Sequence, residues 1–571
     1  MNSETLISDM SSLTPSSALT SDRIPGHWRV CDYTCDGMDG KLIYADVYAH
    51  APLVTLTLGL KGWHRVVVGV WGELEHCGLC PGGHRLKLSS DPCFRPLVRE
   101  TPDPTGTRKF ETIEETVLCS ADLSGNDLVI GPPAPGSKGV TAVAYVRCEP
   151  LSPDQVDQIQ RERSRTDCRR ILAYNDGLAF GGCDRDGLHV DGKDNFREMI
   201  EPYRNSDVDS LYWGLLGDVN PFPTKHGHLA SGPPVEGFDA LNARGINSLT
   251  TAMEYAKGIG VNFYVYQRMG AWEDPFPIDV WASPWTKAHP EYRCVSREGV
   301  PVSRLSYAYD AVRRHQIDLL SEILSWGADG VDLNFMRGPV YVYYEEPLIE
   351  GFKKEFGEDP RTLDEWDEQW LQYRQWPMTA FLRELREELD RVGDKLQKRL
   401  AISAVTLPNA LGNLYYGLDV ETWIKEGLVD RLVPFGLVRG MVEVDLAYYS
   451  EMTRGTSTTF WPFLPIYLKD LSYHDLRKVA LSYYDMGAQG MGVWDITGQQ
   501  HLNVTGPILL RMGHIEALRA AVAEGEKDEI PVAKKLDRIG DVDLTNWTAP
   551  LTHRERLMGS HYQKHMFMWP S

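Results

Sequence analysis

The stretch GADGVDLNFMRGP, residues 327–339, decides how the rest of the chain is interpreted. It alternates with a period of two residues, so that Val331 and Leu333 share one face of an extended segment. Asp332 and Asn334 share the other face. An apolar face, with an acid and an amide near the C-terminal end, is typical of a (β/α)8 barrel strand that carries active-site groups. The simpler alternative is an ordinary strand-to-helix turn with a solvated aspartate.

The segment before this strand predicts an amphipathic helix. Asp310 is suited to cap its N-terminus, and Gly327 is suited to end it. Apolar residues recur at helical spacing between them, namely Val312, Leu319, Leu320, Ile323 and Leu324. A helix followed directly by a buried strand indicates a repeating strand–helix architecture.

The chain is long, acidic and rich in aromatic residues. Its 571 residues are 42% hydrophobic, include 16 Trp and 26 Tyr, and carry a formal net charge of −21. This length is ample for a large core and indicates two or more domains. The negative charge repels a phosphate backbone and an anionic membrane surface, so we expect neither nucleic acid nor a membrane as a partner. Aromatic residues on an acidic protein suit neutral sugars, whose apolar faces stack on Trp and Tyr.

The sequence gives no signal for export or membrane insertion. No apolar run approaches the length of a membrane span. Residues 1–23 are rich in Ser and Thr and lack the basic start and apolar core of a signal peptide. We therefore expect a flexible tail over residues 1–23 and a cytoplasmic protein with free thiols. A secreted protein whose signal has been removed would look similar.

The rest of the chain shows two different sequence patterns, one after the other. Residues 24–160 contain β-branched or alternating runs separated by Gly, Pro, Asp and Asn turns, which predicts a β-sandwich domain. Residues 165–525 alternate strands with helical segments, which predicts an α/β fold, a (β/α)8 TIM barrel. The eight expected strands are 170–176, 209–216, 261–268, 330–336, 400–406, 430–436, 459–466 and 489–496. A doubly wound open sheet is the alternative, but neither a G-x-G-x-x-G nor a Walker A motif appears. Residues 526–571 form a C-terminal extension that the sequence does not place.

The active site of such a barrel lies at the C-terminal ends of its strands. The chain offers carboxylates, amides, arginines and aromatic rings there, which is the set that glycoside chemistry needs. We expect Asp332, Asp495 and Glu443 to be the catalytic carboxyl groups, the first two because each closes a strongly predicted strand. The expected substrate-binding residues are Asp176, Tyr212, Trp213, Gln267, Arg268, Trp272, Asn334, Arg337, Trp461 and Trp494.

Part of the barrel resembles a known family. The run YRCVSREGVPVSRLSYAYDAVRRHQIDLLSEILSWGADGVDLNFMRGP, preceded by HPE, is similar to the family-10-like glycoside hydrolases. The matching residues are His289, Pro290, Glu291, Gly299, Arg313, Asp329, Gly330, Arg337 and Pro339. The resemblance covers about residues 260–340 and implies a β-sandwich plus barrel glycosidase in which a strand-four aspartate is catalytic.

The chain departs from this pattern at the catalytic position. Asn334 stands where the family has its strand-four aspartate, and the nearest acid is Asp332, two residues earlier on the same face. Either the acid has moved one step down the barrel wall, with the asparagine holding a sugar hydroxyl, or the chain has lost its acid and only binds sugar.

Two groups of His and Cys residues raise the question of a metal. The first, within residues 76–93, has one C-x2-C without a partner pair, which favours a loop with scattered thiols. Its members are His76, Cys77, Cys80, His84 and Cys93. The second is His226 and His228 after the second strand, with no third ligand at a recognisable spacing. We expect no bound metal and no cofactor.

The sequence therefore favours an enzyme that hydrolyses glycosidic bonds in an oligo- or polysaccharide. Asp332 is the expected nucleophile or base, and Asp495 or Glu443 the expected proton donor. Arg268 and Arg337 are compatible with an acidic sugar as substrate, because guanidinium groups bind carboxylates bidentately. One alternative is a polysaccharide lyase or sugar-modifying barrel with a tyrosine (Tyr212) or histidine base. The other is a non-catalytic carbohydrate-binding protein on a degenerate barrel.

Overall fold

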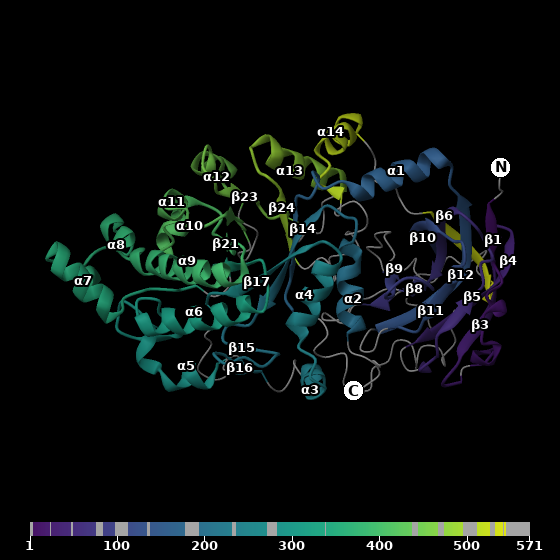
Figure 1. Cartoon of the computed structure of the whole chain (residues 1–571), viewed down its shortest axis with the longest axis horizontal. Coiled ribbons are helices and arrows are strands. Elements are labelled where there is room, and N and C mark those ends of the chain that lie inside the picture. The colour runs from purple at the N-terminus through teal and green to yellow at the C-terminus, as the bar shows by residue number, and fades with distance from the viewer. Residues whose placement is uncertain are drawn as a thin grey trace.

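The structure is a computed structural model of the chain. It describes residues 4–22, 24–46, 49–72, 74–75, 84–97, 112–133, 138–177, 193–230, 236–270, 282–336, 339–436, 443–465, 473–494, 511–525, 532–540 and 542–543. The molecule is elongated, with β-sheets at one end and a parallel sheet surrounded by helices over the rest (Figure 1). No helix among these residues is both long enough and apolar enough to span a membrane.

Eight parallel strands form the sheet of the larger part. They are β13 (Ile171–Asn175), β14 (Val208–Leu215), β17 (Asn262–Arg268), β20 (Gly330–Asn334), β21 (Ala401–Val405), β22 (Arg431–Leu432), β23 (Thr459–Phe460) and β24 (Met491–Trp494). From β13 to β23 they lie side by side in chain order, and β24 lies beside β13. Each one overlaps a strand predicted from the sequence. The doubly wound alternative is wrong, because it requires the strand order to reverse at a switch point.

The parallel sheet curls until its two ends meet. Phe463, just beyond β23, forms a parallel bridge with Gly492 in β24. The Leu464 amide donates to the Gly492 carbonyl at 2.9 Å, and the Gly492 amide donates to the Pro462 carbonyl at 3.0 Å. The inner face of the curled sheet is therefore closed off from the helices that pack outside it.

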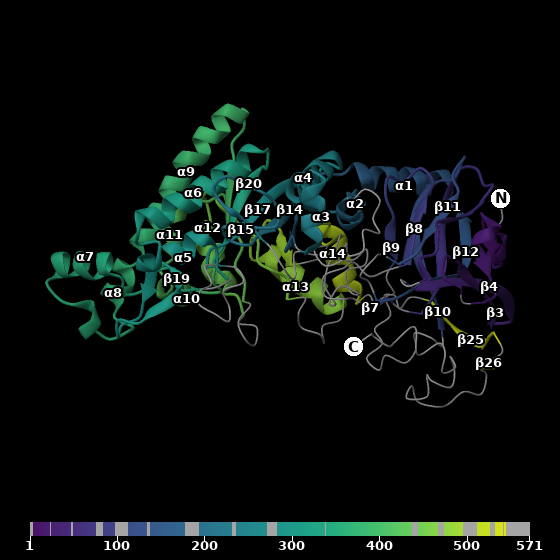
Figure 2. The same ribbon diagram turned by 90° about the horizontal axis from the view of Figure 1, so that it is seen from below.

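Fourteen helices are described, most of them packed around the parallel sheet. They are α1 (Pro153–Ser164), α2 (Asp194–Ile200), α3 (Glu236–Ala243), α4 (Ser248–Gly258), α5 (Pro284–Ala288), α6 (Asp310–Ser325), α7 (Glu346–Phe356), α8 (Glu368–Tyr373), α9 (Trp376–Leu396), α10 (Ala410–Tyr415), α11 (Val420–Lys425), α12 (Leu446–Thr453), α13 (Tyr473–Asp485) and α14 (Ile515–Glu524). Helices α6 and α9 lie side by side (Figures 1 and 2). Apolar residues of these helices and of the outward faces of the strands form the largest core of the molecule.

Helix α6 differs from the prediction at its N-terminus. Tyr309 is the N-cap residue, and Asp310 is the first helical residue. The Asp310 carboxylate pairs with Arg313 instead of capping a backbone N–H, while still placing a negative charge in the first turn. Gly327 follows the helix with a φ of +122°, a conformation that favours glycine, as expected for a residue that ends a helix.

Aspartates at the start of the parallel strands connect neighbouring strands. Asp329, directly before β20, accepts a hydrogen bond from the Phe263 N–H at 2.9 Å. Its other oxygen accepts from the Lys398 ammonium at 2.9 Å. Asp430, directly before β22, accepts from the Ile402 N–H at 2.8 Å in the same manner. The same device thus fixes β17 to β20 and β21 to β22.

Two further sheets form the other end of the molecule. The larger contains β1 (Thr5–Ile7), β2 (Leu19–Thr20), β3 (Trp28–Cys35), β4 (Met38–Asp46), β6 (Trp63–Trp71), β7 (Leu74–Glu75), β10 (Thr112–Asp122), β12 (Lys138–Pro150), β25 (Ala533–Ile539) and β26 (Val542–Asp543). The smaller contains β5 (Val54–Leu56), β8 (His84–Leu88), β9 (Arg95–Leu97) and β11 (Leu128–Gly131). Apolar residues from both sheets share one core. Two short pairs lie elsewhere: β15 (Val219–Asn220) with β16 (His228–Leu229), and β18 (Arg293–Val295) with β19 (Pro301–Leu305).

The larger of these sheets is closed by the C-terminal part of the chain. Strand β25 pairs with β10 on one side and with β3 on the other. Its residues Leu536 and Ile539 are buried in a core with Tyr33, Trp71 and Tyr145. Figure 2 shows β25 and β26 beside β3 and β10. A simple sandwich of two open layers does not describe this sheet, because β25, which lies outside residues 24–160, pairs with both β10 and β3 and so closes it.

The flexible tail expected over residues 1–23 differs from the structure for residues 4–22. Strand β1 pairs antiparallel with β12. Met10 and Leu13 are buried in the core shared by the two sheets. The cause is that apolar residues among the serines and threonines of this segment lie over the sheets and lose solvent exposure.

A buried ion pair joins the two ends of the molecule. The Arg85 guanidinium in β8 contacts both carboxylate oxygens of Glu198 in α2, at 2.5 and 3.2 Å. Beside it, the Tyr255 hydroxyl of α4 donates to Glu201 at 2.7 Å and lies 3.6 Å from the Cys93 thiol. These contacts fix the smaller sheet against helices α2 and α4.

Candidate active site

The inner face of the curled sheet is filled with aromatic rings. Tyr174 of β13 stacks on Tyr212 of β14 at 4.5 Å and on Trp494 of β24 at 5.4 Å. Tyr212 in turn stacks on Tyr264 of β17 at 4.8 Å. Period-two alternation explains this arrangement, since every second residue of these strands faces inward. The interior is thus a packed aromatic core at this level.

Asp332 lies on this inner face and is fully buried, as the alternation of β20 predicts. Neither of its oxygens makes a hydrogen bond with a residue that the structure describes. Burial raises the pKa of this carboxyl to about 7, and the facing hydroxyls of Ser403 and Tyr174 and the charge of Arg431 only partly oppose the increase. Asp332 therefore retains its proton far above the usual range of an aspartate.

Arg431, the first residue of β22, is the cation whose charge acts on the Asp332 carboxyl. Its guanidinium pairs with Asp209 at 2.9 Å and donates to the Tyr212 hydroxyl at 3.2 Å. It also lies over the rings of Tyr264 and Trp461, at 5.2 and 5.1 Å from their centres. At the start of the strands, the Arg431 guanidinium is therefore held between a carboxylate and the faces of two aromatic rings.

The C-terminal ends of β13 and β17 carry a second polar group. Asp176 pairs with the Arg268 guanidinium at 2.8 Å and accepts a hydrogen bond from the Tyr266 hydroxyl. The side chain of Asp176 is 23% exposed and that of Arg268 17%, so both are accessible to a ligand. A side chain at Gly214 would lie 2.7 Å from the Tyr266 hydroxyl, so glycine there leaves room for this contact.

Tyr266 lies on the strand between these two carboxyl-bearing segments and contacts one of the carboxyl groups. It pairs in register with Asp332 across β17 and β20, and its hydroxyl reaches Asp176. Asn334, one step further along β20, pairs in register with Arg268. The Asn334 side chain is fully buried, and its amide nitrogen makes no hydrogen bond with a described residue. The inner face thus offers an amide and a carboxyl on β20, a guanidinium on the neighbouring β17, and a second carboxyl after β13.

Three expected substrate-binding residues do not lie beside these polar groups. Trp213 and Gln267 face outward because their neighbours Tyr212 and Tyr266 face inward, and Trp213 packs in the core under the helices. Trp461 faces inward but lies at the level of Arg431, near the start of the strands. Tyr212 is also inward yet sealed among rings, and burial raises its pKa. A buried tyrosine that holds its proton is poorly suited to be the base of a lyase.

The remaining expected site residues divide into those outside the described residues and those that the structure places. Asp495, Trp272 and Arg337 lie outside the described residues. Glu443 is exposed, just before α12. Burial raises the pKa of the Tyr483 hydroxyl, and the charge of Glu443 adds to this increase. Asp176, Arg268, Asn334 and Trp494 are the expected substrate-binding residues that lie on or above the inner aromatic face. Trp494 is 2% exposed there.

Three residues of this region were missed by the sequence interpretation: Tyr266, Ser403 and Arg431. Their signal is the same alternation, since Tyr266 shares its face with Arg268 in β17, and Ser403 aligns with Asp332 across β20 and β21. The alternation gives the face of each residue. It does not give the register between strands that brings Ser403 beside Asp332.

The histidines considered as alternative bases or metal ligands lie away from the inner face of the parallel sheet. His226 is exposed, and its backbone N–H donates to Glu322 at 3.1 Å. His228 lies in β16. Within residues 76–93, His84 is buried and accepts from the Ala142 N–H at 3.0 Å. Cys93 is buried, with its thiol 3.6 Å from the Tyr255 hydroxyl. The remaining members, His76, Cys77 and Cys80, lie outside the described residues.

Comparison with known proteins gives distant structural likeness only. The sequence matches no protein-family model and no curated protein. Among solved structures, α-L-fucosidase isoenzyme 2 from Paenibacillus thiaminolyticus aligns with 62% of this chain and 50% of its own at 14% identity and a TM-score of 0.40. A β-galactosidase from Halorubrum lacusprofundi aligns with 57% of this chain and 56% of its own, at 12% identity and a TM-score of 0.36.

An α-galactosidase from Thermus thermophilus aligns with 86% of this chain and 95% of its own, at 12% identity and a TM-score of 0.32. The chain spans about half the length of the first two of these proteins. All three carry glycosidase names. Each of the three TM-scores is below 0.5.

Proposed function

We propose that this chain is a glycoside hydrolase whose curled sheet is a (β/α)8 barrel, with its active site at the C-terminal ends of β13, β17 and β20. The β-sheets of residues 24–160, closed by β25 from the C-terminal part of the chain, form an accessory domain. The substrate is an oligo- or polysaccharide, and the family-10-like resemblance around residues 260–340 accords with this proposal.

The observation that carries the proposal is the buried carboxyl of Asp332. Its pKa of about 7 leaves a large fraction of the carboxyl protonated near neutral pH, which suits a general acid. A carboxylic acid in an apolar cage, near a carboxylate held by a cation, is the arrangement by which two carboxyls take different roles. The raised pKa favours the role of proton donor for Asp332 over the nucleophile or base expected from the sequence.

Asp176 takes the complementary role in this proposal. The Arg268 guanidinium and the Tyr266 hydroxyl stabilise its charged form at a position that a ligand can reach. The aromatic rings below supply faces on which a sugar stacks. Asp332 is sealed in the free protein, so one of the rings around it moves before it protonates a glycosidic oxygen in a site shielded from water.

The test replaces Asp332 by asparagine, which has the same shape and no acid. We expect Asp332→Asn to lose at least about 100-fold in kcat on aryl glycosides and neutral oligosaccharides, because a positioned general acid contributes roughly 10²–10⁴-fold. Circular dichroism checks that the fold is kept. The matched control is Asp390→Asn, on the exposed outside of α9, which we expect to be fully active. Full activity in Asp332→Asn contradicts the assignment.

The product separates hydrolysis from the alternatives. A hydrolase gains reducing ends without new absorbance, whereas a lyase creates an unsaturated product that absorbs in the ultraviolet. A binding protein changes neither signal. Saturable sugar binding without turnover in the wild type contradicts the proposed hydrolysis.

A further inference from the structure

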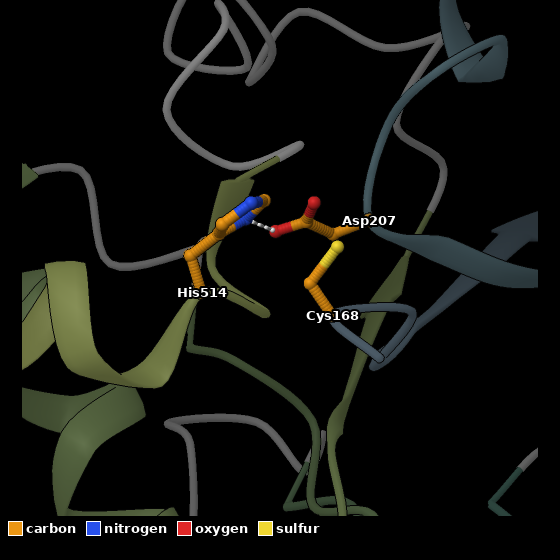
Figure 3. Close-up of side chains that lie close together, drawn as sticks. All are labelled: Cys168, Asp207 and His514. Atoms are coloured by element: carbon orange, nitrogen blue, oxygen red, sulfur yellow. Dashed lines mark hydrogen bonds and ion pairs between the residues drawn. The ribbon is translucent and has the colours of Figure 1, made fainter. Parts of the chain in front are cut away.

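A second cluster of chemically active side chains lies at the start of the parallel strands, opposite the proposed active site. Cys168 comes shortly before β13, Asp207 directly before β14, and His514 directly before α14. One ligand atom from each lies within 4.8 Å of the other two. Figure 3 shows the Cys168 thiol and the His514 ring converging on the Asp207 carboxylate.

The Asp207 carboxylate is fully buried and only half satisfied. Its Oδ2 accepts from the Gly513 N–H at 2.9 Å and lies 2.8 Å from Nδ1 of His514. Its Oδ1 makes no hydrogen bond with a described residue, and the nearest cation is the Arg511 guanidinium at 3.7 Å. A buried carboxylate oxygen without a hydrogen bond is costly, and a bound cation removes that cost.

Glu162 sets the orientation of the histidine. Its carboxylate lies 2.7 Å from Nε2 of His514, on the other side of the ring. A proton on Nε2 donated to Glu162 leaves the Nδ1 lone pair directed at Asp207 and Cys168. Histidine ligands of metals commonly donate their second N–H to a carboxylate in this manner.

The backbone brings the thiol into the cluster. A side chain at Gly513 would lie 1.8 Å from the Cys168 carbonyl oxygen, so only glycine permits this approach of the two segments. Gly513 therefore allows the segment before α14 to contact the segment before β13. The three side chains are positioned before any ligand binds.

We propose that Cys168, Asp207 and His514 bind one zinc ion, with Glu162 as a positioning residue. A thiolate, an imidazole nitrogen and a carboxylate oxygen together favour Zn²⁺ over Mg²⁺ or Ca²⁺, which prefer oxygen alone. The ion takes the place of the proton between Nδ1 and Asp207 and displaces the thiol proton, and water completes the tetrahedron. Because its ligands precede β13, β14 and α14, the last helix among the described residues, the ion joins the start of the parallel sheet to the segment that follows the sheet.

The first experiment uses the wild-type full chain. We expect one zinc ion per chain by atomic emission after dialysis, and Co²⁺ in place of zinc is expected to give a thiolate-to-cobalt charge-transfer band in the near ultraviolet. Folded wild type that holds no stoichiometric zinc and shows no such band overturns the proposal. Glycosidase activity plays no part in this readout, so the result is independent of the proposed function.

Variants then identify the ligands. Cys168→Ser is expected to lose the cobalt band, and Glu162→Gln is expected to keep the band while weakening zinc affinity by roughly 10- to 100-fold. The matched control is Cys119→Ser, a buried thiol in β10, which should bind zinc as the wild type does. A Cys168→Ser variant that retains the band and binds as tightly as the wild type overturns the assignment. If this variant fails to fold, the cobalt band of the wild type decides.

Discussion

At the scale of single residues, Asp332 is the group that the fold treats most unusually. It is fully buried, and its oxygens make no hydrogen bond with a described residue. The Tyr174 and Ser403 hydroxyls face it without reaching good hydrogen-bond geometry. Burial of a charged carboxylate without such bonds is unfavourable, so the folded state favours the protonated form.

The stability of the protein should therefore depend on pH through Asp332. Between its ordinary value of 3.8 and about 7, the folded state holds a proton that the unfolded state has released. Stability from this group is fully present below pH 4 and is lost as pH rises towards 7. The loss is of the order of 4 kcal/mol, since one pKa unit corresponds to about 1.4 kcal/mol.

The measurement is the free energy of unfolding by urea at several pH values. Asp332→Asn has no proton to lose at this position, so the difference between wild type and variant isolates the aspartate from other titrating groups. We expect wild type to lose stability relative to the variant from pH 4 to pH 7. Parallel curves for the two proteins would show that Asp332 ionises normally in the folded state.

The sequence predicts the face of a residue when the pattern of one strand decides it. It does not predict contacts between residues of different strands. The alternation in residues 330–336 placed Asp332 and Asn334 inward without any knowledge of neighbouring strands. The same rule places Trp213 outward once Tyr212 is taken as inward, so both could not line one cavity. The contact of Tyr266 with Asp176 depends on the register of β13, β14 and β17, which no local pattern encodes.

At the scale of elements, the parallel strands are joined at their starts by aspartates. Asp329 bridges β17 and β20, and Lys398 and Lys257 lie at 2.9 and 3.2 Å from its carboxylate. Burial opposes its ionisation, but the Phe263 N–H and the lysines outweigh burial and lower the pKa of Asp329. Asp329 also fits the family resemblance, although its contacts here are those of a strand connector.

We expect Asp329→Ala to lower the free energy of unfolding at pH 7 by about 1–3 kcal/mol, because it leaves the Phe263 N–H without its acceptor. Asp329→Asn is the matched control, since its amide oxygen still accepts that bond and it should lose less. Because the folded pKa is lowered, the contribution of Asp329 exists above pH 4 and disappears as pH falls below its folded value. Urea unfolding at pH 7 and pH 3 measures both effects. Equal losses in the two variants at pH 7 would assign the effect to charge alone.

The elements themselves were largely predictable. All eight strands of the parallel sheet are present, because β-branched and aromatic runs between helical patterns indicate buried parallel strands. Strands β22 and β23 are much shorter than the seven or eight residues expected, since the chain continues after them as buried segments, 433–436 and 461–464, outside the ladder. Hydrophobicity signals burial, and it does not fix where regular pairing stops.

At the scale of the whole molecule, segments far apart in the sequence form one sheet. Strand β25 closes the larger sheet between β10 and β3, so the chain leaves the sheets, forms the parallel sheet and returns. The sequence could not place residues 526–571, because a single short strand finds its partners only through contacts with residues at the opposite end of the chain. The Arg85–Glu198 ion pair adds a direct link between the two parts.

The closed sheet predicts that β25 stabilises a region remote from it in sequence. Leu536 is fully buried beside Tyr33 and Tyr145, whereas Lys535, the preceding residue of the same strand, is exposed. We expect Leu536→Ala to cost about 2–5 kcal/mol in free energy of unfolding, as for other large apolar residues removed from a core. Lys535→Ala is the matched control and should change stability by less than about 0.5 kcal/mol. Hydrogen exchange should also rise in β3 and β10 of Leu536→Ala, because the sheet opens at that seam. If both variants are equally stable and exchange in β3 is unchanged, the strand does not close the sheet in solution.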